Sequence, residues 1–216
     1  MAKDPLKSLR AEMSKAEIDT VIVAFPDVLG RLVGKRFTAE FFLDQVVENG
    51  THGCNYLLAV NMEMDPQEGF SVANWEAGFG DFEMAPDMTT FRSLPWQPGT
   101  ALVLCDYKHH DGRLVAEAPR SVLRTQLEAL AQRGWKSGMA SELEFLLFND
   151  TYREAHLANY DSLTPSSEYR IDYHTMQPTR DEAILRAVRN DMTAAGIPIE
   201  SSKGEWSQGQ HEVNFV

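Results

Sequence analysis

Four of the glutamates lie in two short stretches whose residue types suit chemistry on anions. In the first stretch, Ala140–Phe148, Glu142 and Glu144 are two residues apart in an otherwise apolar run. If this run is a strand, both side chains point to one face. Two like charges that lose water require compensation, and a divalent cation with oxygen ligands supplies it. The alternative is an edge strand with one face in water, and the short motif taken alone favours this alternative.

The second stretch holds Glu205 and Glu212 on either side of a Ser-Gln-Gly turn. Gly209 permits a backbone conformation that other residues resist, and residues 212–216 are typical of a strand. The turn would bring the two carboxylates back to one place. With the first stretch they would form a cage of oxygen ligands for Mg²⁺ or Mn²⁺, and such cages clamp phosphates during phosphoryl transfer.

The two stretches together carry a resemblance to a known family. Glu-Leu-Glu-Phe, followed by Glu-x-x-x-Gly-Gln-x-Glu-Val-Asn, resembles the glutamine synthetase family of ATP-dependent ligases. The resemblance implies that Glu144, Glu205 and Glu212 hold one ion near a glutamate substrate. It also implies that Glu142 helps to hold a second ion on the ATP phosphates, and that Glu200 contacts the nucleotide.

The reaction implied by this resemblance has two steps. The γ-phosphoryl group of ATP moves to the side-chain carboxylate of glutamate, and ammonia or an organic amine then displaces phosphate. Metal ions neutralise the two anions and align the transfer. In ammonia-using members, an aspartate helps to bind ammonium at the place where this chain has His52, within Thr51–Cys54. This departure favours the branch that attaches glutamate to organic amines, such as the γ-glutamylpolyamine synthetases.

The elements that position these residues begin with a predicted helix over residues 5–15. Strands over residues 18–25 and 31–37 follow as a hairpin, and then comes a helix with Thr38 as its N-cap and Gly50 as its stop. Phe41, Phe42 and Val46 are expected on one face of that helix. This order resembles the small β-grasp domain that opens glutamine synthetase chains, and Lys35 and Arg36 are expected to be solvated charges.

The remaining segments fit the start of a catalytic domain. Residues 61–98 are acidic and loop-like, and residues 100–107 form a strand. A helix opens at Pro119 with an apolar stripe that includes Val122, Leu123 and Leu127. A polar excursion over residues 150–180 precedes a helix from its N-cap Asp181 to Ala195. The predicted fold is α+β, with a β-grasp domain over residues 1–112 and the first part of a glutamine synthetase-like catalytic α/β domain over residues 113–216.

Composition narrows the classes of partner. The chain has 216 residues and a net charge of −12, which argues against nucleic acid and anionic membranes. No apolar run is long enough for a membrane span, and the N-terminal Met-Ala-Lys-Asp-Pro has no signal-peptide character. Cys54 and Cys105 are expected to be buried thiols in a reducing compartment, so a cytoplasmic location is predicted. His109, His110 and His211 are interpreted as incidental surface histidines.

The resemblance covers nearly the whole chain but only about half of the family's length. The segments that would complete the second metal site and bind glutamate are absent up to Val216, so the chain alone is expected to be inactive. Two hypotheses stay open: the N-terminal half of a ligase, or a non-catalytic truncated homologue that assembles with or regulates a partner. The resemblance also implies a homo-oligomeric ring with active sites between subunits.

Overall fold

A computed structural model of the chain describes residues 4–15, 17–74, 76 and 78–216. They form two compact units, one up to Ser137 and one from Gly138 to Val216. Trp75 of the predicted acidic segment and the N-terminal Met1–Lys3 lie outside the described residues. Within the described residues, no helix combines the length and the apolar character that crossing a bilayer requires.

The first unit is built on a hairpin, as predicted. β1 (Ile18–Pro26) pairs antiparallel with β2 (Leu32–Thr38). A side chain on Gly34 would place its Cβ 2.0 Å from the carbonyl oxygen of Val23, so the close approach of the two strands requires glycine there. In the turn between the strands, the buried carboxylate of Asp27 accepts hydrogen bonds from the Arg31 backbone N–H and from its Nε, at 2.9 and 2.8 Å.

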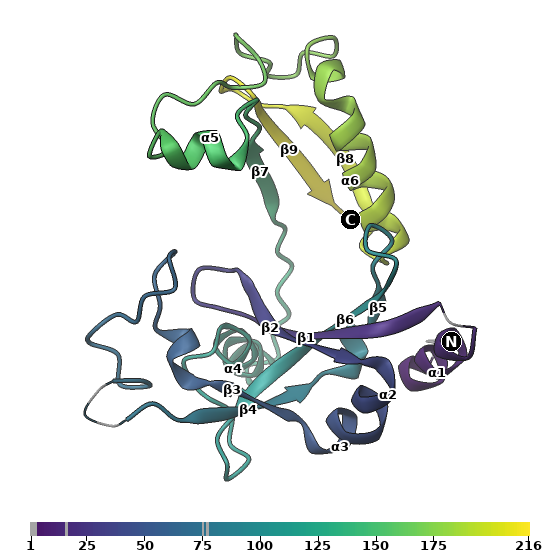
Figure 1. Ribbon diagram of the computed structural model, residues 1–216, viewed down its shortest axis with the longest axis vertical. Helices are drawn as coiled ribbons and strands as arrows, with labels where there is room; N and C mark the ends of the chain where they lie inside the picture. Colours follow the sequence, from purple (N-terminus) through teal and green to yellow (C-terminus); the bar gives the residue numbers. More distant parts are fainter. Residues whose placement is uncertain (1–3, 16, 75, 77) are drawn as a thin grey trace. The chain divides into compact units, whose positions relative to one another are not determined.

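The acidic segment after residue 60 is not the continuous loop that was predicted. It contains β4 (Asp81–Pro86), which lies between β3 (Thr51–Cys54) and β6 (Gly99–Lys108), and the short β5 (Arg92–Ser93). The sheet order is β2-β1-β6-β4-β3, with β5 on β6 (Figure 1). Phe82 and Met84 are buried at strand spacing. The alternation of buried and less buried side chains in β4 is short and is flanked by glycines, prolines and acidic residues, so the sequence pattern alone did not indicate a strand.

Helices cover part of this sheet and begin where capping residues allow them. α1 spans Pro5–Ser14. A second helical stretch runs through α2 (Ala39–Phe41), the π-helical η1 (Phe42–Val46) and α3 (Val47–Asn49). The Thr38 side chain caps it at the Phe41 N–H, as predicted, and Gly50 ends it with φ 67°. The unit also contains two short 3-10 helices, η2 (Asn55–Leu58) and η3 (Met88–Thr90).

The predicted inner face of that helical stretch is only partly correct. Phe42 and Val46 are 0% and 1% exposed, whereas Phe41 is 52% exposed and stacks on Phe37. Neighbouring helical residues point about 100° apart, because a turn holds 3.6 residues, so Phe41 and Phe42 do not share the buried face. The thiols also differ from expectation: Cys105 is buried, but Cys54 is exposed.

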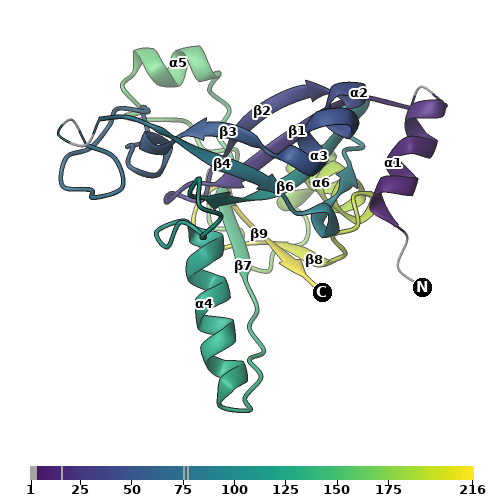
Figure 2. The same ribbon diagram turned by 90° about the horizontal axis from the view of Figure 1, so that it is seen from below.

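The predicted amphipathic helix exists as α4 (Pro119–Gln132), but its apolar stripe is not covered within its unit. Val122, Leu123 and Leu127 are all exposed. Polar contacts hold its start instead, since Arg120 Nε lies 2.8 Å from an Asp106 oxygen and its Nη2 lies 2.6 Å from Asp87. Figure 2 shows α4 extending away from the sheet of this unit.

The second unit is a three-stranded antiparallel sheet with helices. β7 (Glu142–Leu146), β9 (Gln210–Phe215) and β8 (Ile199–Gly204) lie in the order β7-β9-β8. α6 (Glu182–Ala194) contacts β8. The expected polar excursion contains η4 (Pro178–Asp181) and also α5 (Tyr152–Leu157), a helix that the prediction missed. The chain is therefore a mixed α/β protein, and the division into domains at residue 112 stays a prediction.

Candidate functional site

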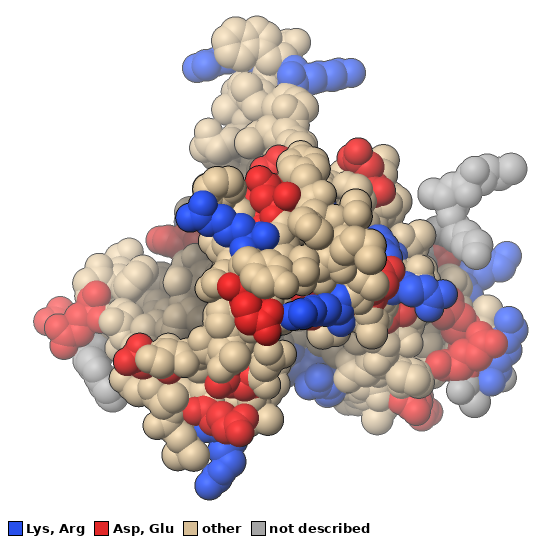
Figure 3. All heavy atoms as spheres, turned by 90° about the horizontal axis from the view of Figure 1, so that it is seen from above, with Lys and Arg blue, Asp and Glu red and all other residues tan. Residues whose placement is uncertain are grey.

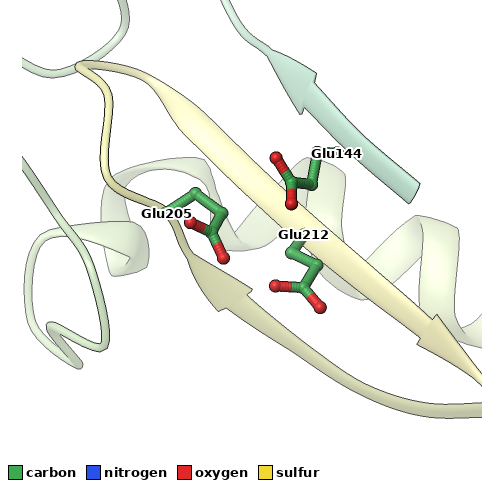
Figure 4. Close-up of side chains that lie close together, drawn as sticks. All are labelled: Glu144, Glu205 and Glu212. Carbon is green, nitrogen blue, oxygen red and sulfur yellow. The ribbon is translucent and has the colours of Figure 1, made fainter. Parts of the chain in front are cut away.

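Three of the four glutamates come together on the sheet of the second unit. β7 and β9 run antiparallel with Glu144 directly opposite Glu212, so the two side chains share one face. Glu205 follows the end of β8, and the chain after it turns back into β9 through Gly209, which has φ 67°. One carboxylate oxygen from each of Glu144, Glu205 and Glu212 lies within 4.8 Å of the other two (Figure 4).

This carboxylate cluster, Glu144, Glu205 and Glu212, fits a hard divalent cation. Mg²⁺ binds oxygen ligands at about 2.1 Å, so oxygens on opposite sides of the ion are about 4.2 Å apart. The observed spacing of up to 4.8 Å is slightly wider, and small side-chain rotations would close it. Carboxylate oxygens are also the ligand type that Mg²⁺ and Mn²⁺ prefer.

Neighbouring polar groups orient each carboxylate. The Gln210 Nε2 donates to Glu144 at 2.7 Å, and the Asn214 Nδ2 donates to Glu212 at 2.7 Å. The Trp206 backbone N–H donates to Glu205 at 3.0 Å. Glu212 is buried, Glu205 is half-buried and Glu144 is exposed. The cluster is thus anchored at its buried end and open to water at Glu144.

Lys203 lies in the cluster, and the sequence patterns alone did not reveal it. Its ammonium contacts Glu205 and lies 3.1 Å from a Glu212 oxygen. Lys203 is paired with Glu212 across β8 and β9. Lys203 stands two residues before Glu205, and side chains two residues apart in an extended chain point to the same face. This spacing could have indicated that Lys203 lies near Glu205.

Lys203 and Glu205 change each other's protonation equilibria. The ammonium that donates to Glu205 lowers the pKa of this carboxyl to about 2. Burial alone would lower the pKa of Lys203, but hydrogen bonds to Glu205 and Glu212 outweigh it and raise the pKa above its ordinary value. The ammonium and carboxylate forms are therefore the stable ones near neutral pH.

The other predicted site residues lie elsewhere. Glu142 is exposed on β7 opposite Asn214, and Glu200 is exposed where the pairing of β8 shifts register. Within the described residues, the three-carboxylate group includes neither of them. His52 is exposed on β3, opposite Glu83, with its ring 6.1 Å from that of His110. The roles of Glu142, Glu200 and His52 stay predictions.

The interpretation of His211 as a surface histidine is wrong. Its side chain is 0% exposed, and its Nε2 lies 2.8 Å from an Asp181 oxygen that also accepts from the Ser166 hydroxyl at 2.8 Å. Alternation along β9 sends His211 to the face opposite Glu212. Asp181 precedes α6 as predicted, but its side chain makes no cap hydrogen bond and binds His211 and Ser166 instead.

The other two histidines differ from each other. His110 is exposed, as predicted. His109 is only half-exposed, and its ring meets the edge of Phe82 at 5.2 Å between centroids.

On the face of the molecule in Figure 3, acidic and basic side chains are interspersed, so the net charge of −12 is not gathered there into one acidic patch.

Comparisons with known proteins show which family this part of the chain resembles. Residues 116–216 match the family model described as glutamine synthetase, catalytic domain. The γ-glutamylethanolamide synthetase GlnA4 of Streptomyces coelicolor is 49% identical over 210 residues, which are 97% of this chain and 46% of that protein. By the match to the family model, residues 116–216 belong to the glutamine synthetase family.

Two further proteins show how far the likeness extends. The glutamate–isopropylamine ligase of a Pseudomonas species is 32% identical over 213 residues, 99% of this chain and 46% of that protein. The solved structure of a GmaS/ADP complex has a TM-score of 0.71 at 20% identity and covers 100% of this chain and 44% of its own, which shows a shared fold. The chain spans about half the length of the curated relatives it matches.

Proposed function

We propose that this chain provides the first part of an ATP-dependent ligase that joins the γ-carboxyl group of glutamate to an amine or to ammonia through γ-glutamyl phosphate. The observation that carries the proposal is the meeting of Glu144, Glu205 and Glu212 within 4.8 Å. All three residues lie inside the segment that matches the glutamine synthetase catalytic domain. The activities for which the relatives are named, γ-glutamylethanolamide synthesis and glutamate–isopropylamine ligation, support the reaction class.

The cluster would hold one Mg²⁺ or Mn²⁺ ion beside the glutamate substrate, and Glu142 would help to hold a second on the phosphates of ATP. Bound divalent ions supply charge neutralisation and alignment for phosphoryl transfer. The chain's own residues prepare the ligands: Asn214 fixes the buried Glu212, and Gln210 orients the exposed Glu144. Glu200 is the proposed nucleotide contact. The ADP complex of the structurally similar GmaS supports ATP as co-substrate.

An organic amine is the proposed second substrate, in preference to ammonia. The name of the relative with 49% identity, which refers to an ethanolamide product, supports it. The resemblance to the family adds the expectation that His52 stands where ammonia-using members carry an aspartate. A histidine supplies no permanent anion for ammonium. His52 is exposed on β3 and accessible for such a role.

The same proposal includes the chain's organisation. A β-grasp domain over residues 1–112 would precede the first part of the catalytic domain over residues 113–216, and the family match from residue 116 supports this division. The assembly would be a homo-oligomeric ring with sites between subunits. Free thiols at Cys54 and Cys105 support a reducing, cytoplasmic location.

Calorimetric titration of the chain with Mn²⁺, with and without a non-hydrolysable ATP analogue, tests the metal site. We expect one binding site that is lost in Glu144→Ala and in Glu205→Ala. The matched control is Glu128→Gln, which removes an exposed carboxylate from α4 and should bind Mn²⁺ as the wild type does. A folded wild-type sample that binds no Mn²⁺ would contradict the proposed role of the cluster.

A further inference from the structure

Lys203 is largely surrounded by carboxylates, unlike a lysine on an open surface. Its side chain is 21% exposed. Besides Glu205 and Glu212, its ammonium lies 3.5 Å from an Asp172 oxygen and 4.4 Å from the centre of the Tyr173 ring. Three carboxylates and one aromatic face therefore surround a single positive charge.

The charge balance explains why a cation belongs there. Asp172, Glu205 and Glu212 converge on one place, and Glu144 brings a further carboxylate to the same cluster. Partly buried carboxylates repel one another and lose hydration, so without a cation this arrangement is unfavourable. An ammonium on a flexible four-carbon stem is a compact point charge with several donors, which suits it to bridge carboxylates.

A divalent cation would bind to the same carboxylates. Glu205 and Glu212 are proposed ligands of the ion and are also the residues that the Lys203 ammonium contacts. Two cations on shared oxygens repel strongly at such short range. The stem of Lys203 allows the ammonium to swing aside toward Asp172, which is already within 3.5 Å.

We infer that Lys203 is the resident cation of the carboxylate cluster: it neutralises Glu205 and Glu212 when no metal is bound, and a divalent ion displaces it. The inference rests on the proposed function, because the displacing ion is the one assigned to Glu144, Glu205 and Glu212. It makes Lys203 a positioning residue that sets metal affinity. The cluster keeps its shape without metal, and each bound ion must first displace the ammonium.

Lys203→Met tests this, because methionine has a similar stem without the charge or the donors. We expect the variant to melt at a lower temperature than the wild type in EDTA, since the carboxylates then repel one another. Its Kd for Mn²⁺, measured by calorimetry, should fall at least about tenfold, equivalent to about 1.4 kcal/mol. Lys203→Arg, which keeps the charge, should stay near the wild type on both measurements.

The matched control is Lys136→Met, which removes an exposed lysine of the other compact unit and should change neither value. If Lys203→Met does not fold by circular dichroism, Lys203→Gln carries the same expectation. A wild type that binds Mn²⁺ as tightly as the neutral variant overturns the inference and leaves the proposed function intact. Absence of Mn²⁺ binding to both overturns the metal site and the inference together.

Discussion

The two compact units differ in the balance of apolar and polar side chains that they bury. In the unit up to Ser137, one apolar cluster reaches from Leu9 to Ala118 and includes residues of β1, β4 and β6. The unit from Gly138 buries few large apolar side chains, chiefly Ile171, Leu185 and Val213. It buries His211 and Glu212 beside them.

The difference shows how each unit is stabilised. Apolar burial is non-directional and tolerates modest changes of neighbours, so the first unit depends on packed volume. Buried polar groups depend on specific partners, and losing one partner costs the desolvation of the group left behind. The second unit therefore holds its site residues by directed contacts, which suits a region that arranges carboxylates.

The largest stability effect is expected from Phe42→Ala. Phe42 is 0% exposed in the apolar cluster, and truncating a buried phenylalanine costs about 3–5 kcal/mol of unfolding free energy. Amide hydrogen exchange should show the loss in peptides from β1 and β6. Phe41→Ala is the matched control, since the neighbouring Phe41 is 52% exposed. Equal losses in both variants would refute the assignment of the buried face.

A smaller effect is expected from Asp181→Ala in the second unit. This change removes the acceptor for His211 and Ser166, and leaving buried polar groups unpaired costs about 1–3 kcal/mol. Asp181→Asn retains an acceptor oxygen and should cost less. Hydrogen exchange of β8 and β9 measures both. If Asp181→Ala leaves exchange unchanged, the buried pair does not stabilise this unit.

A still smaller effect is expected in the dependence of stability on acid pH. Hydrogen bonds, first of all from Lys203 and also from the Trp206 backbone, lower the pKa of Glu205 from 4.5 to about 2. Because the folded-state pKa lies below the unfolded-state value, this carboxylate stabilises the fold above about pH 4.5, and the contribution is lost as the pH falls toward 2. In EDTA, the melting temperature of Glu205→Gln should therefore depend less on pH between 4.5 and 2 than the melting temperature of the wild type does. Parallel curves would mean that the ion pair does not stabilise the folded chain.

The smallest stability effect is expected from Glu144→Gln. Glu144 is exposed, so the free energy of unfolding should change by no more than about 0.5 kcal/mol. Mn²⁺ binding should nevertheless weaken at least about tenfold, since one charged ligand is lost. Glu142→Gln on the same strand should retain the first Mn²⁺ site. An unchanged Kd in Glu144→Gln would remove Glu144 from the proposed ligands.

Local patterns in the sequence predicted much of the scaffold. The β1–β2 hairpin, the Thr38 cap, the Gly50 stop and the start of α4 at Pro119 all depend on residues that are neighbours in the chain. The strand character of Ala140–Phe148 and the turn at Gly209 were likewise readable. They led to a predicted cage of four glutamates, of which Glu144, Glu205 and Glu212 meet. Period, capping and glycine conformation act over a few residues, so the sequence records them directly.

The tertiary structure alone decided which of these residues meet and which are buried. β4 is a strand because β3 and β6 pair with it on both sides, and the local sequence gives only a short alternation. His211 is buried because Asp181, 30 residues earlier, supplies its partner. Lys203 enters the carboxylate cluster because β8 pairs with β9 in the register that sets it against Glu212. Strand pairing and charge neutralisation act between residues distant in sequence, so only the folded chain fixes them.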